Sequence, residues 1–163
     1  MGAASEIIKA VGELGSKKAA RDRAYDENNF ASVVEGCGHA EMEELCSSIE
    51  TSATYNYVSF KPFLNISANV DTEEFRFTNE ELQEALEDLA EKIDSLWYRL
   101  QETVLPTRDG KGYTFDPDKM DRSVSDEVAA DFHSDLEEIC NLCESFRESY
   151  KDFRRLGGSL LGL

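Results

Sequence analysis

Two long segments of the chain carry large apolar residues at alternating spacings of four and three, the heptad pattern of a packed helical face. In residues 79–104 these positions are Leu82, Leu86, Leu89, Ile93, Leu96 and Leu100. In residues 125–156 they are Phe132, Leu136, Ile139, Cys143, Phe146, Tyr150 and Phe153. Because only residues 105–124 separate the two segments, we expect two long helices that pack antiparallel as a hairpin.

Local signals place the ends of both helices. Thr78 is expected to cap the first helix, since Glu81 follows it at the spacing of a capping box. Pro106 ends this helix, because the residue before a proline avoids helical geometry. The second helix is expected to stop at Gly157–Gly158, since glycine commonly follows the last turn of a helix.

The rest of the chain shows shorter patterns. Residues 7–14 predict one short helical face and residues 40–49 predict a second helix. We expect both to cover core positions that the hairpin leaves open. Residues 54–77 contain runs in which every second residue is apolar, which is typical of short strands. Asp109-Gly110 suits a type I′ hairpin turn within residues 107–116.

These patterns predict a mainly α protein, a helical bundle built on the long antiparallel hairpin. Short β elements are possible in residues 54–77 and 107–116. At 163 residues the chain is long enough to bury a sizeable core, and we expect a single helical domain over residues 1–163.

The net charge of −17 changes which partners are expected. The acidic residues are concentrated on the predicted helices, whereas residues 105–124 are neutral. Because such a surface repels phosphate groups, direct binding of nucleic acid is disfavoured. No apolar run is long enough to span a membrane, and the start of the chain does not resemble a secretory signal. We therefore expect a cytoplasmic protein that does not bind membranes.

The four cysteines allow three interpretations. A metal site would require Cys37 and Cys46 to meet the C-x-x-C pair of Cys140 and Cys143. A redox pair would need to lie at a helix N-terminus, but this pair is expected in mid-helix among acidic residues. We interpret all four as small apolar core residues. The four-cysteine metal site is the weaker alternative, and we expect no cofactor.

The sequence contains no phosphate-binding loop, nucleophile elbow or Glu-x-x-His motif, and we predict no catalytic residues. We expect a non-enzymatic interaction or regulatory module that binds a protein partner or a second copy of itself. An acidic inhibitor that mimics nucleic acid and blocks a basic protein is the alternative. The candidate binding residues are Arg108, Lys111, Tyr113 and Phe115, because a long neutral connection between acidic helices is often functional.

Overall fold

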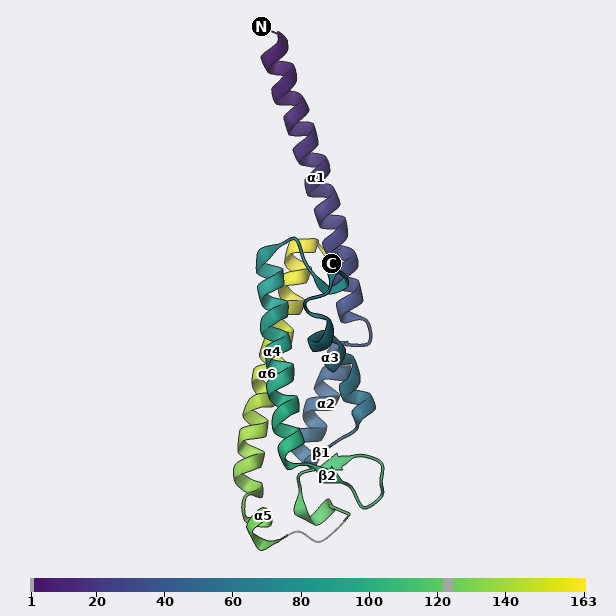
Figure 1. Cartoon of the computed structure of the whole chain (residues 1–163), viewed down its shortest axis with the longest axis vertical. Helices are drawn as coiled ribbons and strands as arrows, with labels where there is room; N and C mark the ends of the chain where they lie inside the picture. The colour runs from purple at the N-terminus through teal and green to yellow at the C-terminus, as the bar shows by residue number, and fades with distance from the viewer. Residues whose placement is uncertain (1, 122–124) are drawn as a thin grey trace.

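The computed structural model describes residues 2–121 and 125–163 and is mainly α, as the heptads predicted (Figure 1). The helices are α1 (Gly2–Val34), α2 (His39–Ser52), α3 (Tyr57–Asn69), α4 (Glu80–Thr103), α5 (Asp126–Ala130) and α6 (Phe132–Leu161). The strands are β1 (Thr54–Tyr55), β2 (Leu105–Pro106) and β3 (Tyr113–Thr114), and Glu73–Phe75 and Pro117–Lys119 form single 3₁₀ turns.

The predicted hairpin is confirmed by α4 and α6, which run antiparallel along the length of the body (Figure 1). All six heptad positions of α4 are fully buried. Those of α6 are buried from Ile139 onward, whereas Phe132 and Leu136 at its start are partly buried. Helices α2 and α3 cover the rest of the seam, and the buried side chains form one contiguous cluster.

The prediction that Thr78 caps α4 is wrong. Asn79 is the cap, and its side-chain oxygen accepts a hydrogen bond from the Leu82 amide at 3.0 Å. Thr78 instead donates its amide and its hydroxyl to the carboxylate of Asp26, at 2.6 and 2.8 Å. Asparagine caps helices as well as threonine does, so the helix starts one residue later at little cost.

The predicted stop at Gly157–Gly158 is also wrong, because α6 continues to Leu161. The helix ends at Gly162, which has a φ of 71° and donates its amide to the Gly158 carbonyl at 3.0 Å. Gly157 lies under the ring of Phe30, where an added Cβ would come within 2.0 Å of a ring carbon. Its glycine therefore allows a close helix contact rather than a turn. At the other end, the predicted helix of 125–156 is interrupted at Asp131, between α5 and α6.

The strands expected in residues 54–77 are confirmed only at β1. Residues 57–69 form α3 instead, and Asn56 caps this helix, because its side chain accepts from the Val58 amide at 2.7 Å. The buried residues of α3 are Phe60, Phe63 and Ile66, which lie three residues apart, as on one face of a helix. The alternation of apolar residues in this segment therefore does not indicate a strand.

The β element expected in residues 107–116 is present as β3, the central strand of a small antiparallel sheet in the order β1-β3-β2. Its turn differs from the prediction. A type I′ turn needs positive φ at two residues, but only Gly110 has it, at 69°. The turn closes through a hydrogen bond from the Gly110 amide to the Thr107 carbonyl at 3.0 Å.

Helix α1 differs most from the sequence prediction. Its 33 residues form one continuous helix, where only a short helical face was expected. The C-terminal part, including Asp26, Phe30 and Val33, packs against the body. The N-terminal part projects alone beyond the end of the body (Figure 1). We call residues 2–21 of this helix, all of which are exposed, the arm.

Candidate functional site

The cysteines do not come together as a four-ligand site. Cys46 and Cys143 are neighbours in the core, with the Cys46 sulfur 4.0 Å from the Cys143 carbonyl oxygen. Cys37 is buried elsewhere, where its carbonyl accepts the Tyr150 hydroxyl at 2.6 Å. Cys140 is partly exposed on α6. Within residues 2–121 and 125–163, no three His, Cys, Asp or Glu side chains are grouped as metal ligands.

The environments of Cys37 and Cys143 keep these two thiols protonated. Burial, reinforced by Glu41, raises the pKa of Cys37 from 9.0 to about 12. A hydrogen bond with Cys46, followed by burial, raises the pKa of Cys143 above its ordinary value. Because the thiolate is the reactive and metal-binding form, these environments favour a packing role.

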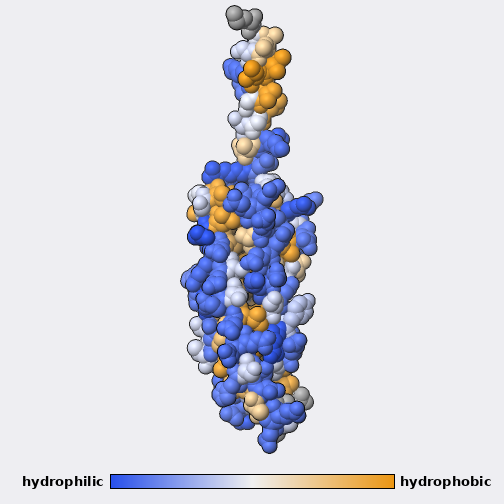
Figure 2. Space-filling model, turned by 90° about the vertical axis from the view of Figure 1, so that its left-hand side faces the viewer, coloured by the Kyte–Doolittle hydropathy of each residue, from blue (hydrophilic) through white to orange (hydrophobic). Residues whose placement is uncertain are grey.

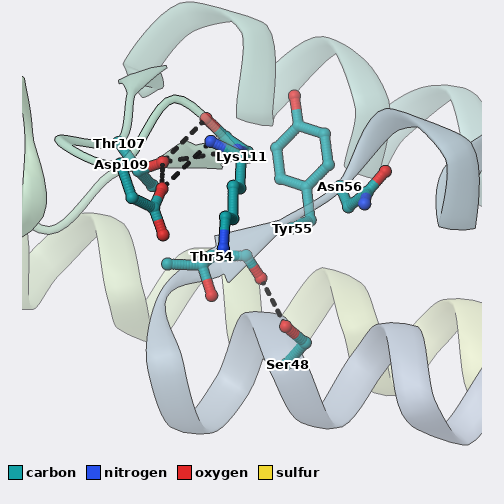
Figure 3. A pocket seen from close by; sticks show the side chains of 8 residues that line it. Ser48, Thr54, Tyr55, Asn56, Thr107, Asp109 and Lys111 are labelled. Carbon is teal, nitrogen blue, oxygen red and sulfur yellow. Dashed lines mark hydrogen bonds between the residues drawn. The ribbon is translucent and has the colours of Figure 1, made fainter.

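The sheet end of the body carries the first candidate surface. A pocket of about 210 Å³ lies between the end of α2, strand β1 and the loop of residues 107–112. Figure 3 shows the side chains that line it. Its lining residues are Ser48, Thr54, Tyr55, Asn56, Thr107, Asp109, Lys111 and Gly112. Two further hollows of about 360 Å³ each adjoin the same loop, one beside Arg108 and one beside Tyr113. We call this surface the loop end.

Hydrogen bonds fix the shape of the loop end. The Asp109 carboxylate accepts from the Thr107 hydroxyl at 2.6 Å and from the Lys111 amide at 3.0 Å. These bonds, led by the hydroxyl, hold the pKa of Asp109 below its ordinary value. The Ser48 hydroxyl donates to the Thr54 carbonyl at 2.8 Å (Figure 3). With its hydroxyl engaged in this way, Ser48 is a structural residue, and the pocket offers a polar binding surface.

The predicted binding residues are placed unequally. Lys111 is exposed, and its side chain extends toward Thr54 across the pocket (Figure 3). Tyr113 is 40% exposed and stacks on Tyr55 with ring centroids 5.7 Å apart. Arg108 is exposed, but its guanidinium donates to the Met120 carbonyl at 2.9 Å.

Phe115 does not reach this surface. Its ring is 3% exposed and lies 5.9 Å from the ring of Phe132 at the start of α6. Thr114 beside it is also buried, and its hydroxyl donates to the Ala53 carbonyl at 2.8 Å. Phe115 therefore joins the sheet to α6, and a partner could contact Lys111, Tyr113 and Arg108 but not Phe115.

The arm is a second candidate surface, which sequence analysis assigned to a short core helix. Four large apolar side chains on it are 63–73% exposed: Ile7, Ile8, Val11 and Leu14. Figure 2 shows the corresponding hydrophobic patch on the projecting end of the molecule. We call these four residues, with Ala4, the arm stripe. A signal was present in the sequence, because the polar residues of KKAARDR separate the stripe from the buried part of α1.

Polar contacts fix the direction of the arm where α1 meets the body. The Asp26 side chain is 3% exposed and accepts three hydrogen bonds, two from Thr78 and one from the Asn79 amide at 3.0 Å. Asn29 donates to the Arg76 carbonyl at 2.5 Å, and Arg23 donates to the Leu161 carbonyl at 2.8 Å. The arm is therefore held rigidly at its base, although nothing in the described structure covers it.

Two arginines of the body each form ion pairs with several carboxylates. Arg147 pairs with three glutamates on α2 and α6, and the shortest of these distances, to Glu50, is 2.5 Å. Arg99 joins α4 to α6 through Asp135 at 2.5 Å and Glu138 at 2.9 Å. These two guanidinium groups therefore offset part of the charge of five carboxylates within the fold.

The helices of residues 2–121 and 125–163 include none that is both long and apolar enough to cross a bilayer. Comparisons of the chain with models of known protein families, with curated proteins and with solved structures found no match. The function is therefore inferred from the two surfaces described above.

Proposed function

We propose that this chain is a non-enzymatic, cytoplasmic interaction module that binds protein. The observation that supports this most strongly is the arm stripe, four large apolar side chains exposed on a helix that is rigidly held away from the body. Contiguous exposed apolar patches on soluble proteins usually mark binding sites.

The energetics favour a covered arm. Full burial of an aliphatic side chain contributes about 1.5–3 kcal/mol relative to exposure. Gly12 and Gly15 lie within the same helix and each lowers its intrinsic stability by about 1 kcal/mol relative to alanine. A helix that lies against the stripe would bury the aliphatic side chains and stabilise this weak segment, as in helix recognition by apolar anchors one turn apart.

The loop end is the second contact surface in this proposal. It combines a tyrosine, a lysine and an arginine with a preorganised polar pocket. Aromatic and arginine side chains are enriched at protein interfaces. Lys111, Tyr113 and Arg108 would bind a protein at this end of the body, which lies opposite the arm (Figure 1).

Affinity capture from extracts of the native cell tests the proposal. The tagged wild type should retain a defined protein, and Val11→Asp should lose it because a charge enters the centre of the stripe. Ser16→Asp is the matched control, since it places the same charge on the opposite face of the arm. Equal capture by all three chains would contradict a binding role for the arm. Lys111→Glu tests the loop end separately.

The charge of the body favours a second candidate function. Residues 24–163 contain 31 acidic and 12 basic residues, so a basic nucleic-acid-binding protein could be bound in place of DNA. The carboxylates that pair with Arg99 and Arg147 would contribute less to such mimicry, because a guanidinium group offsets part of their charge. Capture of a basic protein that is displaced both by DNA and by salt would favour this alternative, whereas capture through Val11 would favour the first.

A further inference from the structure

We propose that the arm stripe is covered by the arm of a second copy of this chain, paired antiparallel. This inference rests on the proposed function, because it names the occupant of the arm. It is carried by the order of residues along the stripe, the charge of the body and the open space around the projecting helix.

The spacing of the stripe suits antiparallel self-pairing. Ala4, Ile7, Val11 and Leu14 are three, four and three residues apart, so they alternate between the two core positions of a heptad. When two such helices run antiparallel, Ala4 of each copy faces Leu14 of the other, and Ile7 faces Val11. Each of the four layers then pairs a residue at one core position of the heptad with a residue at the other core position. Within each layer, a larger side chain faces a smaller one.

The residues beside these four heptad positions also fit this arrangement. Ala3 and Ala10 lie on one side, and their small side chains let the two helices approach closely. Ile8, which is 73% exposed, lies on the other side. In the antiparallel pair the Ile8 residues of the two copies meet across the two-fold axis. The most exposed large apolar residue of the arm would then be covered.

Charge selects the antiparallel orientation over the parallel one. Parallel pairing would hold two bodies side by side, each with 31 acidic and 12 basic residues, and would bring Lys18 against Lys18 of the other copy. Antiparallel pairing separates the points where α1 meets each body by about 40 Å, at 1.5 Å per residue. This is several times the screening length of about 8 Å at physiological salt.

The structure leaves room for the second arm. The arm projects alone, with no other element beside it (Figure 1). Ala4 of the second copy would lie beside Leu14, two turns before Asp22, where α1 approaches the body. Four layers form a small contact, below the roughly 1,200 Å² of a standard interface, so the dimer should be weak and reversible.

Sedimentation velocity of the full chain across the micromolar range tests the dimer. The wild type and Ser16→Asp should dimerise with rising concentration, while Val11→Asp should remain monomeric at every concentration. A monomeric wild type, or a Val11→Asp chain that still dimerises, overturns the inference. Circular dichroism of all three chains shows whether the fold is retained.

Cross-linking tests the orientation. Ile7→Cys and Val11→Cys chains, carrying tags of different mass, are mixed and oxidised, with the wild type reporting background from Cys140. Antiparallel pairing should give mainly the mixed disulfide, because Ile7 faces Val11. Parallel pairing would give only the two disulfides between identical chains and would overturn the proposal.

Binding of the arm stripe to a lipid membrane is a further outcome that these variants distinguish. A chain that stays monomeric but floats with vesicles of phosphatidylcholine and phosphatidylserine, and loses this with Val11→Asp, would overturn self-pairing. If the chain is monomeric in solution but captures a different protein through Val11, the proposed function stands and only the identity of the occupant is wrong.

Discussion

Among the contacts that hold the base of the arm, one is made by a buried carboxylate. Asp26 is the acceptor for both donors of Thr78 and for the Asn79 amide, so it joins α1 directly to the start of α4. Its position also explains why Thr78 does not cap that helix. Hydrogen bonds to a charged acceptor are stronger than neutral ones, and donors left without a partner in a buried site are costly.

Replacing Asp26 should therefore lower the stability of the fold more than most single substitutions do. Asp26→Ala leaves three donors without their acceptor, and we expect the free energy of unfolding to fall by about 2–4 kcal/mol. Asp26→Asn keeps one acceptor oxygen and should lose less. Urea unfolding measures both, and hydrogen exchange at the Thr78 and Asn79 amides shows whether the contact has opened.

Asp22→Ala is the matched control, since Asp22 lies one turn earlier in the same helix and is less buried. Its unfolding free energy should stay within about 0.5 kcal/mol of the wild type. If Asp22→Ala and Asp26→Ala cost the same, the arm is held by the apolar contacts of Phe30 and Val33 and not by the carboxylate.

At the scale of elements, the sequence predicted those helices whose apolar residues all face one core. The heptads of α4 and α6 gave both helices because their stripes are long and uninterrupted. Helix α3 was missed because apolar residues at 64, 66, 68 and 70 imitate a strand, although only Ile66 of these is fully buried. A short apolar run fits both periods, and tertiary packing decides between them.

The sequence revealed only part of the candidate surfaces, and the reason is related to the one for α3. An apolar stripe indicates that something covers it, but sequence alone does not distinguish the chain's own core from a partner. The arm stripe was therefore assigned to the core. At the loop end, Lys111 and Tyr113 are exposed, but Phe115 follows buried Thr114 where the strand ends, so strict alternation fails there.

The contact between α1 and α6 gives a prediction at the same scale. Gly157→Ala should destabilise the fold by about 1–3 kcal/mol, because its Cβ would overlap the Phe30 ring. Gly12→Ala is the control: its Cβ meets nothing within 4 Å, so it should raise helicity without loss of stability. Thermal unfolding compares them, and equal losses would mean that α1 packs differently.

Over the whole molecule, one strongly acidic body carries a weakly basic arm. Residues 2–21 contain four basic and two acidic residues, in contrast to the acidic excess of residues 22–163. Like charges on the body repel one another and weaken the compact state. The partly buried ion pairs of Arg147 and Arg99 act in the opposite direction and tie α2, α4 and α6 together.

Salt separates these two effects. Raising ionic strength from about 0.01 M to 0.15 M shortens the screening length from about 30 Å to 8 Å, which weakens repulsion between distant exposed charges. The Arg147 side chain is only 12% exposed, so its ion pairs are screened less. We therefore expect the unfolding temperature to rise with salt.

Arg147→Gln sharpens this prediction, because it removes the ion pairs with Glu43, Glu50 and Glu144 and adds one unit of net negative charge. Its unfolding temperature should be lower than that of the wild type, and it should rise more steeply with salt. Arg155→Gln makes the same change of charge at a side chain that is 81% exposed and pairs only with Asp152 in the described structure, so it should resemble the wild type. Calorimetry at both salt concentrations measures all three chains. An unfolding temperature that falls as salt is added to the wild type would mean that its ion pairs outweigh the repulsion, and that the acidic surface carries no stability cost for a partner to relieve.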